Sequence, residues 1–421
     1  MFKTNAKNQS HWSWIPSLYF AEGIPYVIVM NIALVLYNNL GVGNAEVAFY
    51  TSWLYLPWVI KPLWSPVVDI FKKKRWWILS MQLLVALSLF GVALTLNVPN
   101  YMFCTLLFFW LMAFCSATHD IAADGFYLLA LNEQEQSFYV GIRSTFYRIS
   151  TIFAQGGLLL LVAFIQSYFA CSTEISWQAT FTFAAILFVG LYAYHNYTLP
   201  KPDTDQTVGL KTSSALNSFL ETFVSFFKKP HILTGVVFLL LYRLPEALLV
   251  KICPLFFLAP VHEGGLGMDK GELGTIQGCV GVVGLLLGGI LGGLAVSKSS
   301  FRRWLWPMVV AISLPDVVYV LLAYYQPSNL GLISLGVFIE QMGYGFGFTA
   351  YMLYMMHLAR GNQQTAHYAL CTGFMALSMM LPGFIAGWLQ EVLGYVGFFT
   401  LATLLTIFTF YVAFLIRKQI N

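Results

Sequence analysis

The chain has 421 residues, of which 58% are hydrophobic and only 10% are charged, and its net charge is +4. Soluble domains carry about 25% charged residues, so this composition excludes a soluble globular protein and favours one solvated mostly by lipid. None of the six cysteines belongs to a CxxC pair, so neither a disulfide framework nor a zinc site is expected.

Long apolar runs recur along the whole chain. Each is about 20 residues long or more, which is enough to cross roughly 30 Å of hydrocarbon, and a lone span satisfies its own backbone only as a helix. The pattern therefore predicts an all-α membrane protein with twelve transmembrane helices. The expected spans are 12–38, 45–70, 76–97, 100–129, 139–167, 177–198, 231–257, 271–297, 304–325, 328–357, 364–389 and 393–416.

The longest polar segment separates the sixth span from the seventh. It covers residues 199–230 and predicts a cytoplasmic linker between an N-terminal six-helix bundle, 1–198, and a C-terminal six-helix bundle, 231–421. The two halves resemble each other, because Ile24-Pro25 in span one corresponds to Leu244-Pro245 in span seven. Two parallel six-helix repeats are typical of the major facilitator fold.

The basic residues indicate the orientation. If the termini and every loop after an even-numbered span face the cytoplasm, that side holds nearly all of them, including the KKKR run at 72–75. The opposite loops hold only Lys270. The positive-inside rule then predicts that both termini are cytoplasmic.

Several ionisable residues fall inside the predicted spans. A charge at the bilayer centre costs about 2.5–3.5 kcal/mol, so such residues persist where they pair, face water or carry a proton. Depths estimated at about 1.5 Å per residue place one group near the midplane and another nearer the cytoplasmic end. The midplane group is Glu22, Arg148, Arg243, Glu246, Asp316 and Glu340, and the other group is Lys61, Asp120, Asp124 and Arg143.

Two aspartates end one of the most apolar runs, FCSATHDIAADGF at 114–126. Asp120 and Asp124 are four residues apart and share one helix face, where their repulsion favours protonation of one of them. Lys61, Arg143 and Arg148 are candidate partners. The pair is either a proton-responsive or substrate-responsive gate, or a structural latch that closes the cytoplasmic side, and depth alone does not separate the two.

The acids near the midplane suggest a cavity. Glu22 has no nearby partner on its own helix and precedes Gly23 and Pro25, which loosen the backbone. Glu340 lies beside Gln341 and the run GYGFG. We therefore assign Glu22 and Glu340, with the aspartate pair, to proton coupling or gating.

A second set of residues is expected to bind substrate: Arg148, Arg243, Glu246, Tyr26 and His119. Arg243 and Glu246, three residues apart, could instead neutralise each other. His119 has no second His or Cys at ligand spacing, which favours a hydrogen-bonding role over a metal site.

Three stretches resemble the AmpG family of muropeptide permeases: AEGIPY at 21–26, KPLWSPVVD at 61–69 and FCSATHDIAADGF at 114–126. The matching residues are Lys61, Trp64, Ser65, Pro66, Asp69, Asp120 and Asp124. His119 departs from the pattern, because the family usually has Gln there. The related acetyl-coenzyme A transporter family shares parts of these motifs.

The acid-then-basic sequence from Asp69 to Arg75 resembles the loop that helps to hold one conformation in major facilitator proteins. We therefore expect Lys61, Asp69, Arg75 and Arg143 to form a gate loop and its motif. The resemblance implies a major facilitator fold and proton-driven uptake of anhydromuropeptides, or related cell-wall sugars, across the inner membrane for recycling.

Other functions remain open at this point. The nearest alternative is a carrier of another solute, such as an amino sugar, a siderophore or an acyl-nucleotide. A membrane enzyme or a sensor is less favoured, because the chain has no HExxH, GxSxG or P-loop motif. The expected partners are a small-molecule substrate, protons and the lipid bilayer. We expect no nucleic acid, metal or other cofactor, no catalytic residue, and a monomeric chain.

Overall fold

The computed structural model describes residues 10–202, 205, 221, 223–360 and 364–420. The described residues are helical apart from short connections. The helices are α1 Ile15–Val27, α2 Ala33–Asn39, α3 Asn44–Trp53, α4 Leu56–Phe71, α5 Lys74–Thr95, α6 Tyr101–Ala130, α7 Glu133–Thr151, α8 Leu158–Tyr168, α9 Thr173–Thr198, α11 Ile232–Leu241, α12 Leu244–Leu258, α13 Lys270–Leu273, α14 Val282–Ser297, α15 Phe301–Ser313, α16 Val317–Tyr325, α17 Leu330–Ala359 and α18 Gln364–Ile416.

Consecutive pieces join into twelve membrane-length rods, which confirms the all-α prediction. Three of the joints are π-helical turns, at Ile28–Ile32, Ile152–Gly157 and Gly274–Gly281. The long helix α18 contains the last two rods, because Gly394 has φ 65° and ψ 174° and breaks the helix there. Among the described residues, eight helical stretches are individually long and apolar enough to cross a membrane.

Span seven is broken where the sequence has Leu244-Pro245. Helix α11 ends at Leu241 and α12 begins at Leu244, with Arg243 at its N-cap position and Pro245 in its first turn. Proline lacks an N–H and is tolerated at the start of a helix but not in its middle. The break therefore places Arg243 at a helix end inside a membrane span.

The chain divides into two compact units. One contains Met1–Tyr26, Ser65–Thr151 and Gln178–Leu210, and the other contains Val27–Trp64, Ile152–Trp177 and Lys211–Asn421. The expected halves 1–198 and 231–421 stay a prediction. Residues 203–204, 206–220 and 222 of the expected linker lie outside the described part.

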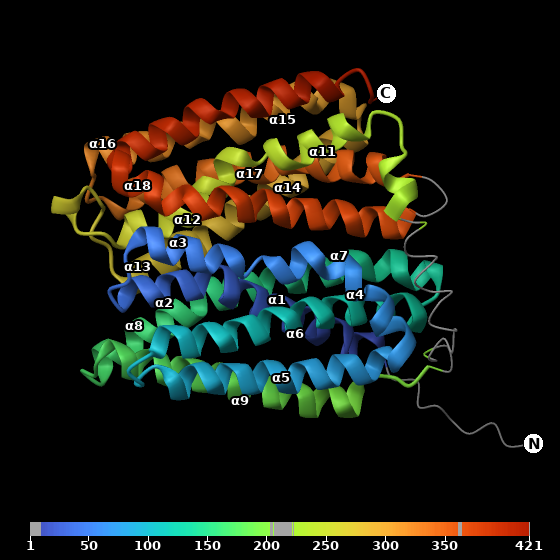
Figure 1. Ribbon diagram of the computed structural model, residues 1–421, viewed down its shortest axis with the longest axis horizontal. Helices are drawn as coiled ribbons and strands as arrows, with labels where there is room; N and C mark the ends of the chain where they lie inside the picture. The colour runs from blue at the N-terminus through green and yellow to red at the C-terminus, as the bar shows by residue number, and fades with distance from the viewer. Residues whose placement is uncertain (1–9, 203–204, 206–220, 222, 361–363, 421) are drawn as a thin grey trace, which may run out of the picture. The chain divides into compact units, whose positions relative to one another are not determined.

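The unit that contains α5 and α6 will be called unit 1. Its helices α5, α6 and α9 lie side by side (Figure 1), and aromatic rings fill the space between them, as where Phe109 meets Phe181 at a centroid distance of 6.0 Å. Trp14, directly before α1, packs edge-on against Phe126 at 5.4 Å. Large apolar residues such as Phe103 point outward and are 67% exposed, as expected of a surface that faces lipid.

The other unit, unit 2, has close glycine packing between α14 and α17. A Cβ atom added at Gly288 would lie 1.9 Å from the carbonyl oxygen of Met342, so only glycine permits this approach. Elsewhere in the unit, Phe238, Tyr242, Tyr351 and Tyr354 form a buried aromatic core. This core packs beside the break in span seven and holds Arg243 in position.

Candidate functional site

Three carboxyl groups meet within unit 1. Glu22 comes from α1, Asp120 and Asp124 come from successive turns of α6, and oxygens of the three groups lie within 4.8 Å of one another. Glu22 is only 7% exposed, and its Oε2 atom has no hydrogen-bond partner in the described part of the chain. The predicted aspartate pair is therefore part of a cluster of three acids, which will be called the acid cluster.

One arginine joins the acid cluster. Arg143 of α7 makes an ion pair with Asp124, with Nη2 2.8 Å from Oδ1. Its guanidinium lies over the rings of Tyr19 and Tyr127, at 4.6 Å and 5.0 Å from their centroids. The hydroxyl of Tyr19 donates to Asp124 at 3.3 Å. Arg143, one of the cations considered as partners for the aspartates, thus forms an ion pair with Asp124.

Gly23 permits the approach of α1 to α7. A Cβ atom at this position would lie 1.9 Å from Oγ of Ser150 and 3.1 Å from the carbonyl oxygen of Tyr147. No side chain fits in this space, so the two helices touch beside Glu22. A glycine that the sequence marked only as loosening the backbone thus brings Glu22 towards the helix that carries Arg143.

His119 lies on the buried face of α6 and is 4% exposed. Its ring is 3.0 Å from the side-chain nitrogen of Gln82, which also lies 2.9 Å from His195. His195 in turn contacts the hydroxyl of Ser17 at 3.0 Å. This buried chain links α1, α5, α6 and α9, and agrees with the hydrogen-bonding role expected for His119.

Arg243 occupies an aromatic enclosure in unit 2. It donates to the hydroxyl of Tyr344, and its guanidinium lies 4.8 Å from the ring centroid of Phe348 and 5.6 Å from that of Tyr351. Rings attract a guanidinium through their negative faces without neutralising it. The group therefore keeps its charge in an apolar setting, and it is 7% exposed.

Glu246 and Glu340 also lie in unit 2. Glu246 stands in the first turn of α12, where the positive end of the helix dipole favours a carboxylate, and it is 6% exposed. Glu340 accepts hydrogen bonds from the hydroxyl of Tyr319 at 2.8 Å and from the amide of Gln341 at 3.0 Å. Neutral groups thus satisfy Glu340, in contrast to the acid cluster. Asp316, placed near the midplane by the sequence, is 3% exposed.

Sequence reasoning missed Lys251. Its ammonium donates to the hydroxyl of Thr51 at 2.9 Å and lies 5.2 Å from the ring centroid of Tyr55, and the residue is 1% exposed. Within the described residues it has no carboxylate partner. The indication was available, because Lys251 interrupts the apolar run ALLVKICPLFF.

The remaining predicted site residues lie at several places. Lys61 is half-buried on α4, and Tyr26 and Arg148 are half-buried on α1 and α7. Arg75, at the start of α5, donates to the carbonyl oxygen of Asn196 at 2.6 Å. Asp69 belongs to α4, but its side chain lies outside the described part, so the expected contact between it and the basic loop stays a prediction.

The acid cluster can hold a proton or a small cation. Three carboxyl groups with one guanidinium leave an excess of negative charge when all are ionised. The spacing of the oxygens would also accommodate a metal ion. Arg143 already supplies a positive charge there, which repels a second cation and favours neutralisation of a carboxyl group by a proton.

Comparison with known proteins supports a transporter. The sequence profile described as "Major Facilitator Superfamily" matches residues 17–387. The chain is 25% identical to "Putative transporter AmpG 4" of Rickettsia conorii over 416 residues, with 96% of each chain covered. It is 24% identical over 389 residues to "Anhydromuropeptide permease" of Escherichia coli K12, covering 91% of this chain and 74% of that protein.

Solved structures agree in fold. The nucleoside transporter NupG gives a TM-score of 0.71 at 14% identity, with 96% of this chain and 98% of that chain covered. A bacterial homologue of the human lysosomal transporter Spinster gives a TM-score of 0.72 at 15% identity, with 99% and 98% covered. At these identities the likeness concerns the helical fold and says nothing of the substrate.

Proposed function

Because this chain belongs to the Major Facilitator Superfamily and is a multi-pass membrane transporter, we propose that it takes up anhydromuropeptides or related cell-wall sugars together with protons. In this proposal the termini face the cytoplasm and the chain acts as a monomer in the inner membrane. Membership of this family makes the protein a carrier and not an enzyme.

The acid cluster carries the proposal of proton coupling. Two carboxylates whose oxygens lie within 4.8 Å of each other repel by at least roughly 3 kcal/mol at an effective dielectric constant of about 20. Keeping a carboxyl group protonated at pH 7 costs about 4 kcal/mol, at about 1.4 kcal/mol for each pH unit. An acid with two like neighbours and one arginine is close to this balance. A small rearrangement of Arg143 would therefore suffice to release or bind a proton.

The surroundings of Arg243 support the proposal that the substrate is an anion. Its charge is enclosed by rings and a hydroxyl, so a carboxylate that reached it would gain a charge-assisted hydrogen bond. It lies at a helix break within a span, and in transporters such breaks surround binding sites. The peptide carboxylates of a muropeptide are ligands of this kind, and the aromatic rings around Arg243 suit a sugar ring.

The relatives support the substrate class. Two proteins that match most of this chain carry the names "Putative transporter AmpG 4" and "Anhydromuropeptide permease". Identities of 24–25% leave room for a different ligand. Substrate identity therefore needs a direct measurement.

The test is uptake by the purified full chain in proteoliposomes. Labelled anhydromuropeptide is compared with an amino sugar, a siderophore and an acyl-nucleotide, each with an imposed proton gradient, with a sodium gradient and with no gradient. We expect the muropeptide alone to accumulate, and only under the proton gradient. Accumulation of another solute would overturn the substrate, and accumulation under the sodium gradient would overturn the coupling ion.

A further inference from the structure

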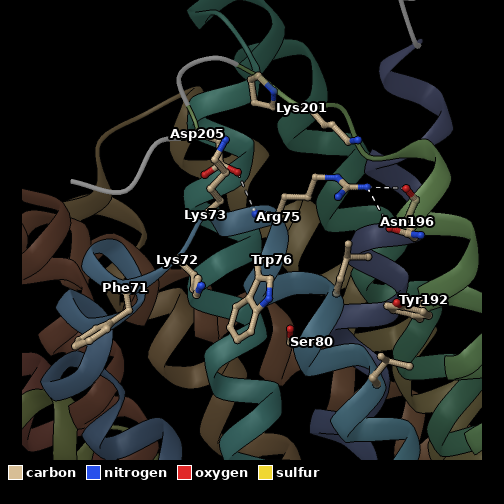
Figure 2. Close-up of a pocket in the computed structure, with 13 residues that line it drawn as sticks. Phe71, Lys72, Lys73, Arg75, Trp76, Ser80, Tyr192, Asn196, Lys201 and Asp205 are labelled. Atoms are coloured by element: carbon tan, nitrogen blue, oxygen red, sulfur yellow. Dashed lines mark hydrogen bonds between the residues drawn. The ribbon is translucent and has the colours of Figure 1, made fainter. Parts of the chain in front are cut away.

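A pocket in unit 1 lies at the start of α5, away from the acid cluster. It has a volume of about 740 Å³. Four cationic side chains line it, those of Lys72, Lys73, Arg75 and Lys201 (Figure 2). The positive-inside rule places these residues at the cytoplasmic surface of the membrane.

Most of this positive charge is not neutralised. Within the described part of the chain, the ammonium groups of Lys73 and Lys201 make no ion pair. That of Lys72 contacts only the ring of Trp76, at 5.8 Å from its centroid. Three exposed ammonium groups around one cavity can therefore take up an anion from outside the protein.

Arg75 forms the fixed wall of the pocket. Its Nη2 atom donates to the carbonyl oxygen of Asn196 at 2.6 Å (Figure 2). Its Nε atom donates to the carbonyl oxygen of Leu199 at 3.4 Å. These acceptors are neutral, so the guanidinium keeps its charge. The contacts hold it in place, with no rotamer freedom left to lose on binding.

Among the described residues that line the pocket, Asp205 is the carboxylate, and it caps a helix. It accepts from the backbone N–H groups of Lys74 at 2.8 Å and Arg75 at 3.1 Å, which are the first residues of α5. A carboxylate at a helix N-terminus is stabilised by these donors and by the helix dipole. The described lining therefore has four cationic side chains and one capped carboxylate, which is an excess of positive charge.

The other side of the pocket is apolar and faces outward. Leu79 and Leu83 are one turn apart on α5, and the exposed fractions of Phe71, Trp76 and Leu83 are 61%, 46% and 40%. Because α5 is long and apolar enough to span a membrane, its exposed side chains Trp76 and Leu83 would meet acyl chains. A tryptophan between a basic rim and an apolar surface is typical of the membrane interface.

We propose that this pocket binds the phosphate headgroup of an anionic glycerophospholipid, with the acyl chains lying along Trp76 and Leu83. Basic pockets between spans on the cytoplasmic side are suited to such headgroups. A soluble phosphate compound shares the headgroup chemistry, but it would leave the exposed apolar wall without a partner. The amphipathic lining therefore favours the lipid.

The experiment measures lipid binding to the delipidated full chain in detergent, by native mass spectrometry and by the lipid-induced rise in melting temperature. The probes are phosphatidylglycerol, phosphatidylcholine with matched acyl chains, glycerol phosphate and inorganic phosphate. The test variant is K72A/K73A/K201A. The matched control, K298A/R302A/R303A, removes the same charge from the basic loop between the eighth and ninth spans.

We expect phosphatidylglycerol to bind the wild-type chain and the control alike. Affinity should fall about fivefold for each lysine removed and about a hundredfold in the triple variant. Equal binding of phosphatidylcholine, unchanged binding by the triple variant, or an equal loss in the control would overturn the site. Displacement of the lipid by glycerol phosphate or inorganic phosphate at equal concentration would assign the pocket to a soluble phosphate compound instead. All lysines in the test variant are exposed, and circular dichroism checks that it is folded.

Discussion

In unit 1, three carboxyl groups share one arginine, whereas in unit 2 one arginine is surrounded by rings and a hydroxyl. Both arrangements keep charge inside a membrane span, but they differ in whether that charge can change by exchange of a proton. The acid cluster has more like charge than Arg143 can neutralise, so its ionisation changes when the geometry changes. Arg243 has no proton to exchange near neutral pH, so its charge is constant and is available to an anion.

The difference suggests a division of labour between the two units. A group that must exchange protons needs neighbours that make its two states similar in energy, and the acid cluster provides them. A group that must attract an anionic ligand needs a constant charge, as Arg243 has. Each prediction below tests one side of this comparison.

The largest effect is expected from the acid cluster. Asp120→Asn and Asp124→Asn each remove one of the carboxyl groups whose repulsion poises the cluster. Uptake driven by a proton gradient should fall at least about a hundredfold, within the range that removal of a proton-transfer group produces. Uptake between pH 5.5 and 8 in proteoliposomes measures the loss. The control is Glu263→Gln, which changes a carboxyl group that is 62% exposed. Normal uptake rates with an unchanged pH profile in both Asn variants would show that the two aspartates do not couple uptake to protons.

The next largest effect is expected at Arg243, where substitutions distinguish the role of its charge from the role of its packing against aromatic rings. Arg243→Ala should raise KM for a carboxylate-bearing substrate by about tenfold or more, since a hydrogen bond to a charged group contributes about 1.5–3 kcal/mol. Arg243→Lys keeps the charge but loses the planar contact with the rings, so its KM should lie between the values of the wild type and Arg243→Ala. The exposed Arg302→Ala serves as control. If Arg243→Ala bound substrate as well as the wild type, Arg243 would be only a packing residue.

The next prediction asks whether the buried charge of Lys251 is needed for stability or for uptake. Lys251→Met keeps the length of the side chain and removes a charge whose burial costs several kcal/mol, so the melting temperature should rise by about 2–4 °C. If Lys251 assists Arg243 in holding an anionic substrate, uptake should fall although the protein is more stable. A variant that loses stability and uptake together would show that Lys251 serves as a structural donor to Thr51.

The smallest effect is expected from Glu135, a carboxyl group outside the spans. Its effect on stability can be compared with that of the buried acids. The backbone N–H of Asn132, and then the ring of His11, lower the pKa of Glu135. A lowered pKa stabilises the fold above about pH 4, and this contribution is lost as the pH falls through the folded-state value. Because Glu135 is partly exposed, the contribution should be below about 1 kcal/mol. Melting curves from pH 3 to 7 should converge for wild type and Glu135→Gln at low pH; a constant difference would contradict this.

Hydropathy was sufficient for the twelve rods, because a span must satisfy its backbone internally and be apolar over a fixed length. Helical periodicity was likewise sufficient to put Asp120 and Asp124 on one face. The Leu244-Pro245 step was used only as a sign of the internal repeat, and the structure shows a helix break there, beside Arg243. These are local properties of the chain, so a single sequence contains them.

The sequence by itself thus determined the helices, the membrane setting and most of the ionisable residues that are buried in it, although Lys251 was missed. Only the tertiary structure decided which of them meet. Glu22 joins Asp120 and Asp124 across about one hundred intervening residues, and Arg243 finds Tyr344 in a helix just as distant. The close contact permitted by Gly23 brings α1 against α7 beside Glu22, and the packing around the span-seven break positions Arg243. Such contacts depend on shape complementarity between helices, which the spacing of residues along one helix does not contain.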